Sequence, residues 1–216
     1  MNTNYNVQEI IDKARLLGCL TYIPTSCGKD CPLIKISDNS NMIVIPDDIT
    51  ELNTVTGYNQ LEFTDVLRNL RGNLSVIGGK GLKSLNKLFD NCDFDELDLS
   101  NFDTRNVTNM YATFCALKAN KLNLTSFNTK KCRTMQLMFA GSKIGTLNLD
   151  SFSTKNVRDM TAMFENMETE VLDLSSFVVK DEKVKVREML YHCTASVIAN
   201  DPIILEAYKR KDQLYW

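Results

Sequence analysis

The fold is decided by the stretch LDLSNFDTRNVTNMYATF, residues 97–114, which the chain repeats with little change. Close copies begin 25 residues apart at Leu122 (LNLTSFNTKKCRTMQLMF) and Leu147 (LNLDSFSTKNVRDMTAMF), and a looser copy, LDLSSF, begins at Leu172. A fixed period of this length indicates stacked repeats, in which a single unit is too small to bury its own apolar face. We therefore expect neighbouring units to stack and to share one core.

Each unit is predicted to contain one strand and one short helix. Leu97 and Leu99 alternate with polar residues, which is the period-2 pattern of a strand with one buried face. Val107, Met110 and Phe114 follow at i, i+3 and i+7, so a helix would bring them to one face. The sequence therefore predicts an α/β fold, a right-handed solenoid with short parallel strands on one face and short helices on the other.

Two further columns are expected to support the turn between strand and helix. A phenylalanine follows the predicted strand in the four recognisable copies and is predicted to fill the core beneath the turn. Two residues later, three units carry a threonine whose hydroxyl is expected to cap free amides or to hold the turn. The phenylalanines are Phe102, Phe127, Phe152 and Phe177, and the threonines are Thr104, Thr129 and Thr154.

The period extends in both directions and gives five units over residues 72–195, more than the three or so that a stable stack needs. The last unit requires four extra residues within VVKDEKVK, after which Val186, Met189 and Cys193 are predicted to take the helix columns. The leading unit is degenerate. Its predicted column partners are Leu74 with Leu99, Ile77 with Phe102, Leu85 with Met110, and Phe89 with Phe114.

The segments on either side of the repeats are expected to cap them. Residues 1–71 are predicted to form an N-terminal α/β capping unit, and residues 196–216 a C-terminal cap. Prolines should interrupt the regular elements of the first segment. Its predicted elements are a helix near Val7–Leu17, strands at Leu33–Ile36 and Met42–Ile45, and a helix near Leu61–Leu70, with breaks at Pro24, Pro32 and Pro46.

Composition and charge point to a soluble, cytoplasmic protein. The formal net charge is -2 over 216 residues, which argues against a wholly basic nucleic-acid binder. The N-terminus lacks the apolar run of a signal peptide, and no stretch approaches the roughly 20 apolar residues of a membrane span, so no membrane partner is expected. Seven cysteines, an odd number without paired spacing, indicate reduced thiols rather than a disulfide framework.

The repeat resembles that of the BspA-like leucine-rich family, whose units read close to LDLS-x-F-DTS-x-V-T-N-M with a following M-F. The match covers residues 72–195, and VIANDPIILEAYKRKDQLYW is similar to the strand, proline and short Tyr- and Trp-containing helix that end many such domains. The resemblance implies a leucine-rich-repeat-like solenoid and a role in protein binding. Members are mostly bacterial surface and secreted proteins, whereas this sequence carries no evident export signal or wall anchor.

No catalytic residue, cofactor or metal is expected. The single histidine, His192, lies beside a core column without an evident acid or nucleophile partner. Cys27 and Cys31, together with Cys19, would supply three thiolates, but the paired sets of a structural zinc site are incomplete. The run GGKG at Gly78–Gly81 lacks the ending of a phosphate loop and is interpreted as a turn.

One polar column stands out as a candidate binding surface. The residue after the turn threonine is basic in all five units, as Lys or Arg, so charge rather than one residue type is retained. Stacked strands lie about 4.8 Å apart, so the column would form a ridge on the order of 20 Å long. The column consists of Lys80, Arg105, Lys130, Lys155 and Lys180, and Arg133 and Arg158 follow it three residues later.

The sequence thus predicts a non-enzymatic module that binds an intracellular protein through the solenoid surface. A second hypothesis is a phage- or mobile-element-encoded inhibitor of a bacterial immune effector that handles nucleic acid, similar to an anti-CRISPR protein. In that case the basic column would contact nucleic acid or nucleoprotein, or compete for an acidic surface. A third is a cell-surface adhesin exported without a recognisable signal.

Overall fold

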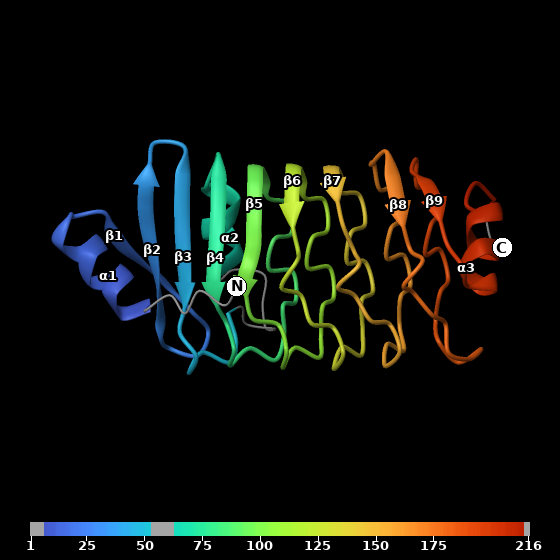
Figure 1. The fold of residues 1–216 in the computed structure, drawn as a ribbon, viewed down its shortest axis with the longest axis horizontal. Coiled ribbons are helices and arrows are strands. Elements are labelled where there is room, and N and C mark those ends of the chain that lie inside the picture. Colours follow the sequence, from blue (N-terminus) through green and yellow to red (C-terminus); the bar gives the residue numbers. More distant parts are fainter. Residues whose placement is uncertain (1–6, 53–62, 214–216) are drawn as a thin grey trace.

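The computed structural model describes residues 7–52 and 63–213, and these form a β-solenoid of about five turns (Figure 1). Successive turns lie side by side, so their strands make one long face of the molecule. The stacking and the parallel strands predicted from the repeat are confirmed. Among the residues described, no helix is both long and apolar enough to cross a bilayer.

The strands form one seven-stranded sheet and a two-stranded continuation. The first three strands pair antiparallel, and from β3 onward every neighbour is parallel. An isolated parallel β-bridge pairs Lys143 with Glu168, three residues before the small sheet begins. The order in the large sheet is β1 (Leu20–Pro24), β2 (Asp30–Ser37), β3 (Ser40–Ile45), β4 (Asn73–Gly78), β5 (Asp93–Phe102), β6 (Lys118–Asn123) and β7 (Lys143–Leu147), and the small sheet contains β8 (Val171–Asp173) and β9 (Ser196–Ile198).

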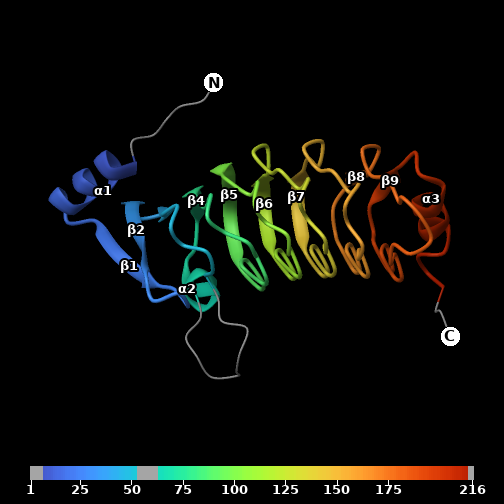
Figure 2. The same ribbon diagram turned by 90° about the horizontal axis from the view of Figure 1, so that it is seen from below.

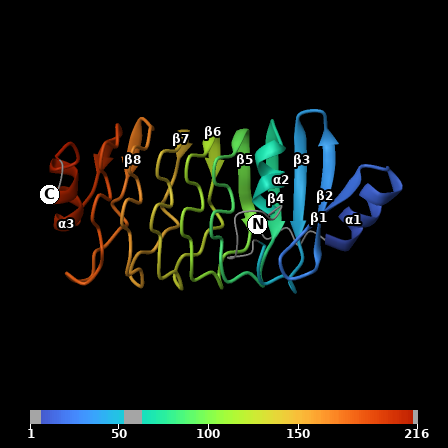
Figure 3. The same cartoon turned by 180° about the vertical axis from the view of Figure 1, so that it is seen from behind.

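Helices are found only outside the repeats. α1 (Val7–Leu16) packs through Ile11 and Ala14 on the outer face of the N-terminal strands, and α3 (Pro202–Lys209) lies at the opposite end of the stack (Figure 2). α2 (Phe63–Asn69) covers the first turn on the side away from the strands (Figure 3). In the described part of the chain three helices therefore flank the solenoid, and none lies between β4 and β9.

The predicted helix in each unit is wrong, because the chain returns through consecutive tight turns. Ala112 and Ala116 have φ of 49° and 51°, whereas an α-helix needs negative φ at every residue. The N–H groups of alternate residues donate to the next turn instead of to the residue four positions earlier. We call residues 85–92, 110–117, 135–142, 160–167 and 186–193 the return segments, and the hydrogen bonds between them the return ladder.

The return ladder has four rungs between each pair of neighbouring turns. From the second turn to the third, the N–H groups of Met110, Ala112, Phe114 and Ala116 donate over 2.8–3.0 Å. The same pattern of donors recurs between every earlier and later pair up to the last return segment. Alternate N–H groups are thus satisfied between turns, as in a sheet, while those of Thr113, Cys115 and Leu117 donate to carbonyls three residues earlier in the same segment, and no helix is needed. The four acceptors of that set are the carbonyls of Thr134, Gln136, Met138 and Ala140.

Two aromatic columns fill the core, as the repeat predicted. Phe89, Phe114, Phe139 and Phe164 stack with ring centroids 5.2–5.6 Å apart. The second column lies beneath the turn that leaves the strand, with centroids 5.9–6.3 Å apart. Both columns are buried in every copy, so the aromatic stack forms the continuous core that single units lack. The second column is Phe102, Phe127, Phe152 and Phe177.

The leading unit departs from the predicted columns in its strand. Leu74 pairs with Leu97 rather than Leu99, because β4 and β5 change register at a bulge between Ser75 and Ile77. Ile77 consequently faces outward and packs against α1. The position beneath Phe102 is filled by the backbone of Gly79, where a Cβ atom would lie 2.5 Å from the ring.

Elsewhere in that unit the predictions hold. Leu85 and Phe89 occupy the predicted columns of the return segment. Gly78 and Gly79 have φ of 85° and 90°, which supports the interpretation of GGKG as a turn.

The last unit contains one extra residue rather than the predicted four. The residues with positive φ recur at 25-residue steps through Ala162 and Asn166, and then at 26 residues in Glu188 and His192. Leu190 therefore lies in the column of Phe164. Val186 lies in the column of Met160, and Met189 lies in the column of Met163. Cys193, whose N–H donates to Leu190, belongs with Cys92, Leu117 and Met167 and not with the phenylalanines.

The elements of the flanking segments agree with most of those predicted from the sequence. α1, β2, β3 and the described part of the predicted second helix are confirmed, and Leu61 lies outside the described residues. The strand β1 was not predicted, and Pro32 lies within β2 rather than interrupting it. The C-terminal strand, proline and helix are confirmed, with Asp201 as the N-cap and Trp216 outside the described residues. The boundary at residue 71 stays a prediction.

A candidate binding edge of basic residues

All seven basic residues singled out in the sequence are exposed along the turn edge of the solenoid. In each unit the chain buries the residue before the basic side chain, which directs the next residue to solvent. Thr129 is fully buried, for example, and Lys130 is exposed. We call this surface the basic edge. It consists of Lys80, Arg105, Lys130, Lys155 and Lys180, with Arg133 and Arg158 beside them.

Buried threonine hydroxyls hold the turns of the basic edge in register. The hydroxyl of Thr129 accepts from the N–H of Ser153 at 2.7 Å and donates to the carbonyl of the same residue at 2.9 Å. Thr154 makes the equivalent pair of bonds to Val178, at 2.7 and 2.8 Å. Each hydroxyl thereby joins two successive turns. The predicted role of these threonines in holding the turn is confirmed, although they act between units.

Asparagine side chains tie the backbone of the basic residues to the next turn. Nδ2 of Asn106 donates to the carbonyl of Lys80 at 3.0 Å, and Nδ2 of Asn156 to that of Lys130 at 2.8 Å. Nζ of Lys131 donates to Oδ1 of Asn106 at 2.7 Å. The backbone beneath the basic side chains is therefore fixed before any partner binds.

The N-terminal part of the basic edge is neutralised by carboxylates. Nε of Arg105 lies 2.8 Å from Oδ2 of Asp103, and the hydrogen bond to this carboxylate raises the pKa of the guanidinium. Nζ of Lys80 lies 3.9 Å from Oδ2 of Asp47. A depression of about 530 Å³ beside these residues contains both carboxylates as well as both cations, so it does not favour an anion.

The C-terminal part of the basic edge carries cations that form no ion pair. Lys130, Lys155 and Lys180 form no ion pair with any residue in the described part of the chain, and neither do Arg133 and Arg158. The extra residue of the last unit follows Lys180, which still comes directly after a buried residue, Val179. The structure therefore brings five positive side chains together over three successive turns.

The other candidate residues of the sequence lie apart from the basic edge. His192 is half exposed, with Nδ1 3.7 Å from Oδ1 of Asp212. Burial raises the pKa of the Cys31 thiol to about 12. Within residues 7–52 and 63–213, no group of His, Cys, Asp and Glu side chains is placed to hold a metal ion, and Cys19, Cys27 and Cys31 are free thiols.

The sequence analysis did not predict that carboxylates pair with two residues of the basic edge. Asp103 precedes Arg105 by two residues, a spacing that an Asx turn requires, so this pair carried a readable signal. Asp47 comes from the loop after β3 and meets Lys80 only through the parallel pairing of β3 with β4. That contact depends on tertiary structure and has no local signal.

Comparison with known proteins identifies the repeat but adds no function. No curated protein and no solved structure matches the chain. A family model described as a Mycoplasma protein of unknown function, DUF285, matches residues 83–200, which is more than half of the chain and contains most of the return ladder and of the basic edge. The chain belongs to this DUF285 family of about 25-residue solenoid repeats.

Proposed function

We propose that the chain is a non-enzymatic binding module that recognises an acidic surface of an intracellular protein through the basic edge. The observation that carries this proposal is the set of five cations that form no ion pair in the described chain, on a backbone held by buried threonine hydroxyls. A rigid array of like charges is unfavourable for the free protein, and a complementary partner relieves it. The seven free thiols support a partner in a reducing compartment.

A binding role agrees with the rigidity of the surface. Because the turn backbone is already ordered, association does not have to order it, and the entropic cost of binding is reduced. Charged residues along such an edge would mainly accelerate association and select the partner, and they would contribute less to the final affinity. The proposal therefore predicts a strong salt dependence of the association rate.

Nucleic acid or nucleoprotein is the second candidate partner. It is favoured by the arrangement of the free cations in two adjacent columns, with Lys130, Lys155 and Lys180 in one and Arg133 and Arg158 in the other. Such an arrangement suits a phosphate backbone, which would give a linear fall of log affinity with log salt. An inhibitor of a nucleic-acid-handling immune effector, encoded by a phage or mobile element, would use the same contacts.

A pair of charge-matched variants tests the proposal. Lys130→Glu with Lys155→Glu reverses the centre of the free charge, and Lys13→Glu with Lys118→Glu makes the same change in net charge at exposed lysines elsewhere. Proteins and nucleic acids captured from the native host by each variant would be quantified at low and moderate salt, with and without nuclease. We expect the first pair to lose the specific partner and the second to retain it. Equal capture by both pairs would exclude the basic edge as the binding surface.

A further inference from the structure

The last return segment has backbone donors that no later turn receives. In every earlier pair of turns, four N–H groups of one return segment donate to the next. Of the four equivalent N–H groups in the last segment, only that of His192 has an acceptor in the described chain, the carbonyl of Lys211 at 2.9 Å. The N–H groups of Val186, Glu188 and Leu190 donate to nothing in the described chain. Three rungs of the return ladder are therefore open at this end.

A largely apolar groove lies beside these open rungs. It has a volume of about 430 Å³ and runs between the last return segment and α3, where Ile203 and Ala207 contribute apolar side chains. The charges at its rim are paired locally, since Arg187 contacts Glu188 at 3.1 Å and Arg210 contacts Glu206 at 2.6 Å. The groove thus offers apolar surface and backbone donors, with little net charge.

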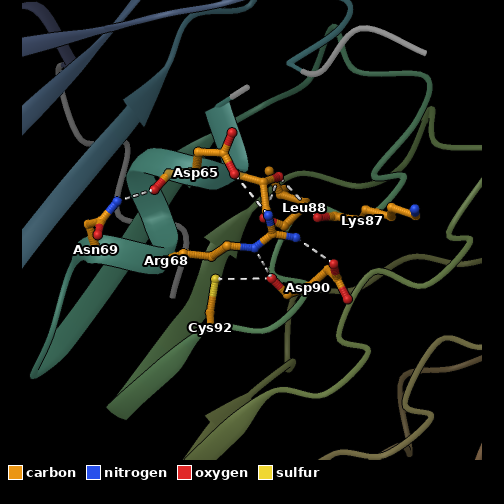
Figure 4. A network of polar contacts seen from close by, with 8 residues as sticks. Asp65, Arg68, Asn69, Lys87, Leu88, Asp90 and Cys92 are labelled. Atoms are coloured by element: carbon orange, nitrogen blue, oxygen red, sulfur yellow. Dashed lines mark hydrogen bonds and ion pairs between the residues drawn. The ribbon is translucent and has the colours of Figure 1, made fainter. Parts of the chain in front are cut away.

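A second copy of the chain does not supply the missing acceptors. The opposite end of the return ladder presents carbonyls, and α2 bonds to two of them, those of Leu88 and Asp90. The Thr64 hydroxyl donates to the carbonyls of Lys87 and Leu88. Nε of Arg68 donates to the carbonyl of Asp90 (Figure 4). Two copies joined through their open ends would place donors against donors. Pairing of two copies through these ends therefore leaves the donors without carbonyl acceptors.

The carbonyl of Lys211 shows what kind of acceptor fits. It comes from outside the repeats and occupies the fourth rung at an ordinary distance. An extended peptide presents carbonyls on one side at every second residue, which matches the alternate donors Val186, Glu188 and Leu190.

We propose that this groove binds an extended, apolar segment of a partner polypeptide, which adds one more layer to the return ladder. Backbone carbonyls of the segment accept from the N–H groups of Val186, Glu188 and Leu190, and its apolar side chains pack against Ile203 and Ala207 of α3. The surface is separate from the basic edge and serves a partner with a different chemistry, so this inference does not depend on the function proposed above.

The test uses a phage-displayed library of random dodecapeptides selected against the full-length protein. Selected peptides would be synthesised and their binding measured against two variants of α3. Ala207→Arg fills the groove, whereas Leu205→Arg places the same side chain on the exposed side of the same helix, outside the groove. Circular dichroism would establish that both variants fold. Amide exchange by NMR would report which N–H groups the peptide protects.

The expected result is a set of peptides with apolar residues at alternate positions, whose affinity falls at least 10-fold in Ala207→Arg and stays within 2-fold in Leu205→Arg. Binding should slow exchange at Val186, Glu188 and Leu190. Selection of no peptide, or of peptides that bind both variants equally, would overturn the proposal. So would protection of these three amides in the free protein that is lost on deletion of residues 214–216 or on dilution, because the groove would then already hold the chain's own tail or a second copy.

Discussion

The two ends of the return ladder end the same repeat in opposite ways. At the N-terminal end the exposed groups are carbonyls, and α2 satisfies two of them, that of Leu88 through Thr64 and that of Asp90 through Arg68 (Figure 4). At the C-terminal end the exposed groups are N–H donors, and α3 leaves three of them open. A solenoid must end its backbone ladder at both ends, and each cap determines whether that end contributes stability or is available for binding.

The largest expected effect lies between the two ends, where the stack is complete. Phe127 is buried and contacts Phe102, Phe114 and Phe152. Phe127→Ala should reduce the free energy of unfolding by about 3–5 kcal/mol through lost burial and the cavity it leaves. Asn123→Ala on the outer strand face should cost less than about 1 kcal/mol. Chemical denaturation measures both, and equal losses would mean that the strand faces are assigned the wrong way round.

The capped end should be more sensitive than the open end. Arg68→Met removes hydrogen bonds to the carbonyl and carboxylate of Asp90 and to Asp65, and should cost about 2 kcal/mol, the usual value for bonds to a charged group. Arg187→Met at the open end loses one pair, with Glu188, in which the arginine is 70% exposed, and should cost at most about 0.5 kcal/mol. Thermal unfolding of the two variants measures both losses of stability. A similar loss in both would remove the difference between the ends.

A smaller change in stability is expected from substitutions at positions of positive φ in the return segments. Gly141 has φ of 65° with open space around the position of a Cβ atom, so Gly141→Ala should cost about 1 kcal/mol through backbone strain alone. Ala116 holds the same place in the preceding turn with φ of 51°, and Ala116→Gly should be neutral or stabilising. If these segments were helical, as the sequence alone suggested, both substitutions would have the opposite sign.

The alkylation rates of two buried thiols allow the two ends to be compared in the unmutated protein. Cys92 lies beside Arg68 at the capped end, and Cys193 lies in the last return segment; both are buried, and burial raises the pKa of each thiol, that of Cys92 to about 12. Each must therefore be exposed by local opening before it reacts as a thiolate. Because the last segment lacks three rungs, Cys193 should be alkylated several-fold faster than Cys92.

Cys27 provides an internal standard for this measurement. Its slight burial alone would raise the pKa, but hydrogen bonds from the Thr25 hydroxyl and from the backbone of Lys29 outweigh burial and lower it. Cys27 is also exposed, so it should react first. Mass spectrometry after brief treatment with iodoacetamide gives the order of labelling. Labelling of Cys92 before Cys193 would contradict the assignment of the open end.

The sequence predicted the stack and its core because both depend on a repeated spacing. Leucine, phenylalanine and threonine columns recur with the same neighbours, so their burial followed from the period. The return path was predicted wrongly because Val107, Met110 and Phe114 satisfy a helical spacing, while positive φ at Ala112 has no signal in an alanine. Tertiary hydrogen bonding between turns overrode the local pattern. For the same reason the open donors of the last segment were invisible in the sequence.

The candidate surfaces divide in a similar way. The basic edge could be predicted, because one residue in each period is basic and the residue before it is buried. Its uneven charge could not, since Asp47 reaches Lys80 from another part of the chain. The single extra residue of the last unit was misjudged as four because Leu190 replaces phenylalanine in the column that marks the register.

Residue-resolved amide exchange tests the central claim most directly. The N–H groups of Met160, Ala162 and Phe164 donate to the last return segment, whereas those of Val186, Glu188 and Leu190 have no acceptor in the described chain. In the free protein, the first three should exchange only through opening that approaches global unfolding, whereas those of Val186 and Glu188, which are partly exposed, should exchange within about 10-fold of an unstructured chain. Equal protection of the two sets, or the continuous protection of a helix across each return segment, would contradict this account.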